Sequence, residues 1–411
     1  MPAVHHKRTC CRACEGGRLT PFLTLGPQPL ANAFLVSPDE FSGEASYPLD
    51  VYFCESCSLV QLADVIDPEV LFRNYIYVTG TSDTIARHNT AYARTVTDLL
   101  GLGPRDLVME VASNDGSLLR EFKALGVSTL GVEPAANLAE MARQNGIATE
   151  NRFFNSDAAR GLRQSYGRAK AVVANNVLAH VDDTIDFLRG ARDLLAEGGM
   201  VVFEVPYLVE LLNRLEYDTV YHEHLCYFSV MGLRTLCESA GLGIARIDRV
   251  PVHGGSLRVY AAAQSDHGAH AAEMAEAERQ AGLDSIARYR KFAADVARSR
   301  GLLRNLLCHL RSEGRSLAAY GAPAKGNTLL NYCGIDTSLL PFTVDKNERK
   351  VGLYTPGMHI PVRPVSALLE EQPDDVLILA WNFASEIMSQ QQTYRARGGR
   401  FITPVPEPLV Y

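Results

Sequence analysis

The chain has 411 residues, of which 47% are hydrophobic and 21% charged, and its formal net charge at pH 7 is −7. This composition is typical of a globular protein with several domains. It argues against nucleic-acid binding, because phosphate neutralisation requires clustered Lys and Arg, and no long basic run occurs. No targeting segment opens the sequence and no apolar run approaches a membrane span, so we expect a cytoplasmic protein that binds no membrane.

Five of the nine cysteines fall in the first 57 residues. Four of them form two C-x-x-C pairs, Cys11 with Cys14 and Cys54 with Cys57. Two such pairs, each on a tight turn, complete a tetrahedral zinc site. A redox pair or chance would explain one C-x-x-C, but two in so short a segment favour zinc. Because four cysteines leave no open coordination position, we assign this zinc a structural role; Cys10 could compete with Cys11.

A first α/β unit begins with the apolar run 107–112, which predicts a buried parallel strand. The loop 113–116 follows, and then a helix. A second strand, 128–133, ends in Glu133, and Pro134 opens the next helix. In such a unit, an acid about twenty residues beyond the loop faces the ribose hydroxyls of an adenosine ligand.

The loop of this unit holds one glycine, so it lacks the G-x-G-x-x-G that brings a dinucleotide pyrophosphate to a helix N-terminus. S-adenosylmethionine has no phosphate and requires less glycine. A βαβ unit without a ligand is the structural alternative. Further strands are predicted at 171–176 and 200–205. The expected cofactor-binding residues are Glu110, Ala112, Asn114, Asp115, Gly116, Glu133, Pro134, Asn175 and Asn176.

A second α/β unit begins with a strand at 316–320 and a loop of small residues at 321–327 that leads into a helix. A helix N-terminus beside Lys325 suits a diphosphate, although a structural loop is the alternative. We interpret the cations that follow the next strand as a solvated face; they are Lys346, Arg349 and Lys350. Before this unit, apolar residues recur every three or four positions and predict one or two amphipathic connecting helices.

Residues 217–229 read YDTVYHEHLCYFS. This segment resembles the signature of the sugar C-methyltransferase family, whose members make branched deoxysugars from nucleotide-linked 4-keto sugars. The rest of the chain matches too, in family order. The matching parts are both C-x-x-C pairs and the segments 71–77, 110–116, 251–256, 319–327 and 354–359.

The resemblance implies an α/β chain with a small N-terminal zinc-binding domain (1–74) and a central Rossmann-like class I methyltransferase domain (75–268). A helical connector (269–310) and a C-terminal Rossmann-like α/β domain that binds the nucleotide-sugar (311–411) follow. The implied cofactors are S-adenosyl-L-methionine and structural Zn²⁺. The implied substrate is a dTDP- or GDP-linked 4-keto-6-deoxysugar, methylated at C3, or at C5, beside the C4 ketone. We expect a monomer or small homo-oligomer.

Methylation of carbon requires a base near neutral pKa and a donor for the developing enolate oxygen. By resemblance, His224 is the base, Tyr221 orients it, and Glu223 fixes a sugar hydroxyl or polarises an imidazole. The alternative is a capped turn, or a metal held by His222 and His224 from a strand; we interpret His222 as structural. The expected catalytic residues are His224, Tyr221, Glu223, His180 and Tyr75. The expected substrate-binding residues are Tyr77, Tyr221, His253, Ala322, Lys325, Asn327, Asp345, Trp381 and Asn382.

Two other functions fit parts of the pattern. An NAD-dependent nucleotide-sugar oxidoreductase would use the same folds, and a non-catalytic zinc-containing binding protein would use the cysteines alone. Thermal stabilisation by S-adenosylhomocysteine, by NAD or by neither would separate the three functions.

Overall fold

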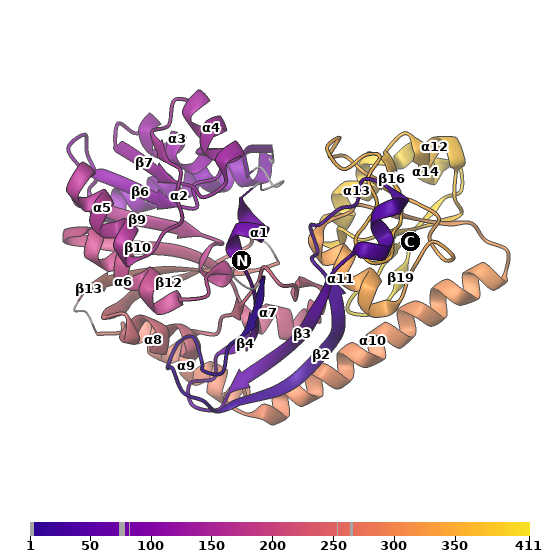
Figure 1. Cartoon of the computed structure of the whole chain (residues 1–411), viewed down its shortest axis with the longest axis horizontal. Coiled ribbons are helices and arrows are strands. Elements are labelled where there is room, and N and C mark those ends of the chain that lie inside the picture. The colour runs from indigo at the N-terminus through magenta and orange to yellow at the C-terminus, as the bar shows by residue number, and fades with distance from the viewer. Residues whose placement is uncertain (1–3, 74–78, 82, 253, 264–265) are drawn as a thin grey trace. The chain divides into compact units, whose positions relative to one another are not determined.

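A computed structural model describes residues 4–73, 79–81, 83–252, 254–263 and 266–411 (Figure 1). Three predicted site residues, Tyr75, Tyr77 and His253, lie outside these described residues.

The chain forms two compact units, each made of three segments. Unit 1 consists of Met1–Thr20, Phe53–Leu208 and Leu225–Ser285, and unit 2 of Pro21–Tyr52, Val209–His224 and Ile286–Tyr411. The units cut across the predicted domains, because the cysteine-bearing segment contributes to both of them. The segment that carries Tyr221 to His224 leaves the methyltransferase part of the sequence and joins unit 2.

Unit 1 is built on a seven-stranded sheet in the order β12-β13-β10-β9-β6-β7-β8. Neighbours from β10 to β8 are parallel, whereas β13 runs antiparallel between β10 and β12. This is the Rossmann-like sheet that the resemblance implies for the central domain. The strands are β6 (Leu107–Val111), β7 (Ser128–Val132), β8 (Thr149–Glu150), β9 (Ala169–Asn175), β10 (Leu195–Pro206), β12 (Leu242–Val250) and β13 (Ser256–Ala263).

Both faces of this sheet are buried. Tyr92 and Phe122, from helices on one face, pack with Val173 of β9, while the alternate strand residues Val172 and Ala174 are also buried. The two fully covered faces explain why the strands read as continuous apolar runs. The α-helices are α1 (Pro68–Phe72), α2 (Asp83–Leu100), α3 (Ser117–Ala124), α4 (Ala136–Gln144), α5 (Ser156–Tyr166), α6 (Thr184–Leu194), α8 (Val230–Ser239) and α9 (Ala269–Gln280).

Short strands frame the cysteine segment. β1 (His5–Lys7) pairs antiparallel with β5 (Asp64–Ile66), and β11 (Cys226–Tyr227) pairs antiparallel with β4 (Val60–Leu62). The remaining short elements of unit 1 are the 3-10 helices η2 (Thr79–Thr81) and η3 (Leu178–His180). The pairing of β11 with β4 ties the chain just beyond His224 to the strand that follows the second cysteine pair.

Unit 2 contains a six-stranded sheet in the order β16-β15-β14-β17-β18-β19, parallel except for β19. This doubly wound order places a topological switch point between β14 and β17. The strands are β14 (Leu317–Tyr320), β15 (Thr343–Asp345), β16 (Val362–Pro364), β17 (Asp375–Ile378), β18 (Arg400–Thr403) and β19 (Leu409–Val410), with helices α11 (Ala324–Cys333), α12 (Ala367–Glu371), α13 (Ala384–Gln390) and α14 (Gln392–Ala396).

The predicted connecting helices are α9 and α10 (Ile286–Ser312), and α10 is the long continuous helix labelled in Figure 1. α10 buries a stripe that includes Tyr289, Phe292 and Val296. Unit 2 also holds most of the long strands β2 (Leu19–Pro29) and β3 (Ser46–Cys54), with η1 (Pro38–Gly43), α7 (Leu208–Arg214), η4 (Tyr217–Thr219) and η5 (Trp381–Phe383). Within the described residues, no helix combines the length and apolarity needed to cross a membrane.

Candidate functional site

The four predicted zinc ligands come together in unit 1. The sulfur atoms of Cys11, Cys14, Cys54 and Cys57 all lie within 4.8 Å of one another. Cys11 Sγ is 3.5 Å from Cys57 Sγ, and Cys14 Sγ is 3.6 Å from Cys54 Sγ. Sulfurs about 2.3 Å from a tetrahedral zinc are about 3.8 Å apart, so this donor set fits the metal. Gln61 Nε2 donates to Cys11 Sγ at 3.2 Å.

The residue between the first two cysteines links this cluster to a loop of the methyltransferase sheet. The Arg12 side chain is fully buried, and its Nε and Nη2 lie 3.1 and 3.0 Å from Asp182 Oδ1. Arg8 Nη1 donates to the backbone oxygen of Asp182 at 3.0 Å, and Thr184 Oγ1 donates to Arg12 O at 2.9 Å. Asp182 lies two residues beyond His180. Sequence reasoning missed this contact, because no pattern pairs residues 170 positions apart.

The cofactor loop follows β6, and several of its residues have positive φ although only one of them is a glycine. Gly116 has φ 75°, and a Cβ there would lie 3.0 Å from Ile147. Ala112, Asn114 and Asn176 also have positive φ, of 56°, 51° and 54°. Strained backbone of this kind clusters at ligand sites.

Glu133 stands at the carboxyl end of β7 and is 4% exposed. Its Oε2 accepts a hydrogen bond from Asn114 N and its Oε1 one from Ala135 N, both at 2.8 Å. Burial raises the pKa of Glu133, and these two backbone donors oppose that rise. Each oxygen retains a further lone pair, so the fixed carboxylate can still accept from a pair of hydroxyls. Helix α4 begins at Ala136 rather than at Pro134.

Three carboxyl groups converge here. Burial, and then the neighbouring Asp115 and Glu133, raise the pKa of Glu110 well above its ordinary value. Glu110 Oε2 is buried without a hydrogen bond in the described part of the chain. An acidic cluster suits a ligand that carries positive charge, as the sulfonium and amino groups of S-adenosylmethionine do, and opposes a pyrophosphate. The buried groups thus fit the methyl donor better than NAD.

The other predicted cofactor residues border the same sheet edge. The Oδ1 of Asn175, at the end of β9, is buried without a hydrogen bond among the described residues, and Asn176 N donates to Glu204 O at 2.8 Å. Asn151, which sequence reasoning missed, donates through Nδ2 to the backbone oxygens of Glu133 and Pro134 at 2.8 and 3.0 Å.

His180 ends η3 and is half-buried in unit 1. Its ring meets the Phe72 ring edge-on, with centroids 5.6 Å apart. The backbone before it is fixed, because Leu225 N donates to Ala179 O at 2.6 Å.

The Tyr-His-Glu-His cluster lies in unit 2 and forms a turn, closed by His224 N donating to Tyr221 O at 2.8 Å. The alternative in which His222 and His224 hold a metal from a strand is therefore wrong, because these residues do not form a strand. His222 is 1% exposed, and its Nε2 lies 3.3 and 3.2 Å from the backbone oxygens of Tyr47 and Pro48. Among the residues that the structure describes, the four cysteines are the one group arranged to hold a metal.

His224 is oriented by the backbone. Its Nδ1 lies 2.8 Å from Thr219 O. A carbonyl oxygen only accepts, so Nδ1 carries the proton and the lone pair of the neutral ring is on Nε2. The Tyr221 ring covers the imidazole, with centroids 4.0 Å apart at 35°. Nε2 is thus the basic nitrogen of the neutral ring.

Glu223 is 3% exposed, and its Oε1 accepts from Asn32 Nδ2 at 2.6 Å. Lys350 contributes positive charge nearby. The solvated face predicted for Lys350 is wrong, because its Nζ donates to Ala322 O at 2.7 Å and lies 5.1 Å from the Phe34 ring centroid. Burial lowers the pKa of Lys350, whereas Asp345 and Glu223 raise it.

The loop after β14 is shorter than predicted. Pro323 caps α11, which starts at Ala324, so Lys325 and Asn327 lie in the first helical turn. Asn327 is 1% exposed and donates through Nδ2 to Ala31 O at 2.7 Å. Asp345 Oδ2 accepts from Ala322 N at 2.7 Å and so holds the loop itself.

Lys325 lies on the face of Trp381, with Nζ 3.9 Å from the ring centroid, and donates to Asn382 Oδ1. Burial lowers its pKa, and the neighbouring Asp218 and Glu216 raise it. Trp381 Nε1 donates to Asp218 Oδ2 at 2.6 Å. The structure therefore brings together three predicted substrate-binding residues, and adds two buried acids that sequence reasoning missed.

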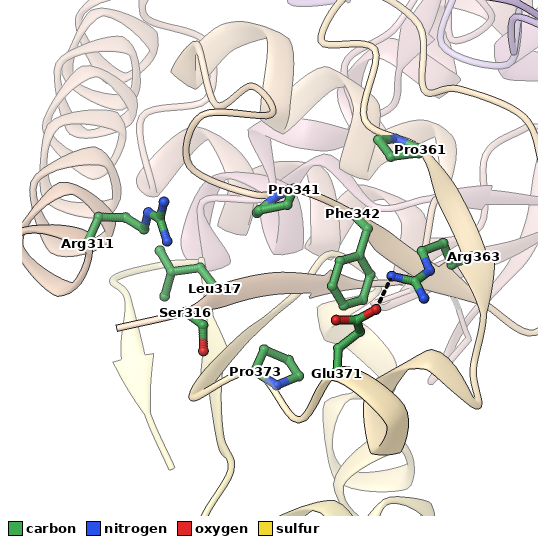
Figure 2. Close-up of a pocket in the computed structure, with 9 residues that line it drawn as sticks. All are labelled: Arg311, Ser316, Leu317, Pro341, Phe342, Pro361, Arg363, Glu371 and Pro373. Carbon is green, nitrogen blue, oxygen red and sulfur yellow. Dashed lines mark hydrogen bonds and ion pairs between the residues drawn. The ribbon is translucent and has the colours of Figure 1, made fainter. Parts of the chain in front are cut away.

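A pocket of about 340 Å³ lies elsewhere in unit 2 (Figure 2). Ser316 and Leu317 line it where β14 begins, and Arg363 and Glu371 form an ion pair of 2.9 Å at its rim. It thus opens at the amino ends of the strands. Ligands of doubly wound sheets bind at the carboxyl ends, where α11 starts, so we do not assign this pocket to the site.

Three family models match the chain. They are "C-methyltransferase C-terminal domain" over residues 251–406, "Putative zinc binding domain" over 11–72 and "Methyltransferase domain" over 85–246. C-methyltransferase NovU of Streptomyces niveus is 38% identical over 403 residues, which cover 97% of this chain and 96% of NovU.

The similar solved structures each match less than half of this chain. PH0226 protein from Pyrococcus horikoshii OT3 is 13% identical and has a TM-score of 0.39, over 48% of this chain and 96% of its own. The CcbJ methyltransferase from Streptomyces caelestis is 18% identical and has a TM-score of 0.35, over 43% of this chain and 90% of its own.

Proposed function

Since the chain belongs to the C-methyltransferase family and is an S-adenosylmethionine-dependent, zinc-containing enzyme, we propose that it methylates a nucleotide-diphosphate 4-keto-6-deoxysugar. The carbon would be C3, or C5, beside the C4 ketone. The observation that carries this proposal is the orientation of His224, whose Nδ1 faces a backbone carbonyl and whose Nε2 is left as the basic atom.

His224 Nε2 takes the proton from the carbon beside the ketone, and the electron pair of that bond moves toward the carbonyl oxygen. The Thr219 carbonyl stabilises the imidazolium that forms. Tyr221 holds the ring in place from its face. Tyr75 or His180 donates to the enolate oxygen. S-adenosylmethionine, held by the residues around Glu133, would supply an electrophilic methyl group to the carbon and would leave as S-adenosylhomocysteine.

The nucleotide-sugar would lie against the start of α11. The backbone N–H groups that open α11 at Ala324 and the Lys325 ammonium suit a diphosphate. Trp381 and Asn382, which now hold Lys325, would border the same ligand. The residues proposed to bind the substrate also include Ala322, Asn327, Asp345, Tyr77 and His253.

A panel of nucleotide-linked 4-keto sugars, incubated with the enzyme and S-adenosylmethionine, tests the proposal by mass spectrometry. We expect a gain of one methyl group on a dTDP- or GDP-linked substrate, and NMR of that product locates the carbon. An enzyme that is stabilised by S-adenosylhomocysteine but methylates no member of the panel would contradict the substrate and leave the enzyme class intact.

A further inference from the structure

A short turn in unit 2, residues 30–34, is held by one hydrogen bond within the turn and by two hydrogen bonds to other segments. It is closed by Ala33 N donating to Leu30 O at 3.0 Å. Asn327, in the first turn of α11, donates to Ala31 O at 2.7 Å. Asn32 in turn donates to Glu223 at 2.6 Å. One turn therefore connects the start of α11 to the Tyr-His-Glu-His turn.

The contact between Asn32 and Glu223 has the features of a charge-assisted hydrogen bond. It is short, and the carboxyl group is nearly inaccessible to water, so it needs a hydrogen-bond donor from the protein. Among the described residues, the charged and titratable groups near it include Lys350, whose pKa both Glu223 and Asp345 raise, and Tyr221, His222 and His224 of its own turn. An amide is the donor that orients Glu223 without adding charge.

We propose that Asn32 is a positioning residue for the Tyr-His-Glu-His turn, residues 221–224. It holds Glu223 as an oriented acceptor, and through Ala31 and Asn327 it couples that orientation to the helix start where the diphosphate would bind. This role rests on the proposed function. It also gives a purpose to a segment that the sequence assigned to the zinc-binding domain.

Asn32→Asp provides the sharpest test, because it replaces the amide by a carboxyl group of the same shape. Two carboxylates at this distance repel each other, so the pair retains one proton up to a raised apparent pKa and loses it only above that pKa. The protonated carboxyl group can donate as the amide does. We expect the kcat of Asn32→Asp, relative to native enzyme, to fall about tenfold per pH unit above the apparent pKa of the pair. For Asn32→Ala we expect the ratio of its kcat to that of native enzyme to be low at every pH.

Asn213→Asp, the same substitution at an exposed asparagine of α7, is the matched control and should leave the ratio flat. In the background of Glu223→Gln, Asn32→Ala should change kcat far less than it does in native enzyme, because positioning acts through the carboxylate. Additive effects of the two substitutions, or a flat pH ratio for Asn32→Asp, would overturn the proposal.

A readout without turnover separates this proposal from the proposed function. The pair's pKa is raised in the folded state, so Asn32→Asp should lose stability as pH rises through that pKa, and its Tm should fall relative to native protein. Adding Glu223→Gln should abolish this pH dependence. If the Tm coupling is present while no keto sugar is methylated, the substrate is wrong and the pairing stands. If the Tm difference is independent of pH, the pairing is wrong.

Discussion

His224 shows how one backbone contact decides the role of a side chain. With Nδ1 facing Thr219 O at 2.8 Å, the ring can present only Nε2 as a base. Neither the spacing of the two histidines nor their neighbours in sequence indicates this tautomer, because the acceptor is a main-chain oxygen that every residue carries.

His224→Ala should lose turnover and retain both ligands, since the base acts on the way to the transition state. A general base contributes on the order of 10²–10⁴ in rate. With S-adenosylhomocysteine in deuterated water, native enzyme should exchange the sugar's α-proton and the variant should exchange it far more slowly. His309→Ala, an exposed histidine on α10, is the control. Exchange at the native rate in His224→Ala would assign the base to another residue.

Glu133→Ala should weaken the binding of S-adenosylhomocysteine by about 1–3 kcal/mol, the range for a lost charge-assisted hydrogen bond. Part of that loss reflects the loop, because Glu133 also orders Asn114 N and Ala135 N. Isothermal titration calorimetry measures the change, with the exposed Glu140→Ala as the matched variant. Equal affinities in both variants would remove Glu133 from the cofactor site.

Glu216 provides a pH test of the buried acids. Burial and Asp218 raise its pKa to about 7. A folded-state pKa above the unfolded value means that stability is full at acidic pH and is lost as pH rises through about 7. Glu216→Gln abolishes this loss, so its Tm relative to native protein should rise from pH 5 to pH 8. The exposed Glu348→Gln should show no such trend. A Tm difference that falls or stays level for Glu216→Gln would contradict the raised pKa.

Among the elements, the strands were the most predictable. β6, β7 and β9 occur where apolar runs indicated, because strands covered on both faces need apolar residues on both sides of the strand. The start of α11 was placed too late. Its first turn is made of Ala, Lys and Gly, which read as a loop. Gly326 is required there, since a Cβ would lie 2.8 Å from Leu379 Cβ. The burial of Lys350 was missed because its partner is a backbone oxygen on another loop.

The fluorescence of Trp381 can report ligand binding at the start of α11, because Trp381 is the single tryptophan of the chain and contacts Lys325. Its indole contacts Lys325 on one face and donates to Asp218. A nucleoside diphosphate that draws the ammonium away should change the fluorescence of Trp381. Lys325→Met should abolish most of this change, and Lys346→Met, an exposed lysine, should not. An unchanged titration in Lys325→Met would place the diphosphate elsewhere.

The cysteine cluster is the element on which the metal prediction depends. We expect about one zinc per chain, measured by elemental analysis of purified protein, with the four thiolates as ligands. Cys57→Ser should lower both the zinc content and the Tm, whereas Cys308→Ser, an exposed cysteine on α10, should change neither. Native protein without zinc, or a disulfide within the cluster, would contradict this assignment.

At the scale of the whole molecule, the classes of fold were predictable, whereas the grouping of residues 21–52 and 209–224 with the C-terminal sheet was not. Alternating strands and helices indicated two Rossmann-like sheets, and both are present. Membership of residues 21–52 and 209–224 in unit 2 depends on contacts such as that of Asn32 with Glu223. Residues 191 positions apart leave no local pattern that announces such a contact.

The interleaving of the two units has a consequence for how the protein is made. Six segments alternate between the units, so the chain passes from one to the other five times. Unit 1 is whole only when residue 285 has been synthesised, and unit 2 only when the last residues of the chain have been added. The early segment 21–52 therefore waits through most of synthesis for its partners. Long-range closure of this kind slows folding and exposes apolar surface meanwhile, so nascent chains of this enzyme should depend on chaperones more than a protein with two consecutive domains would.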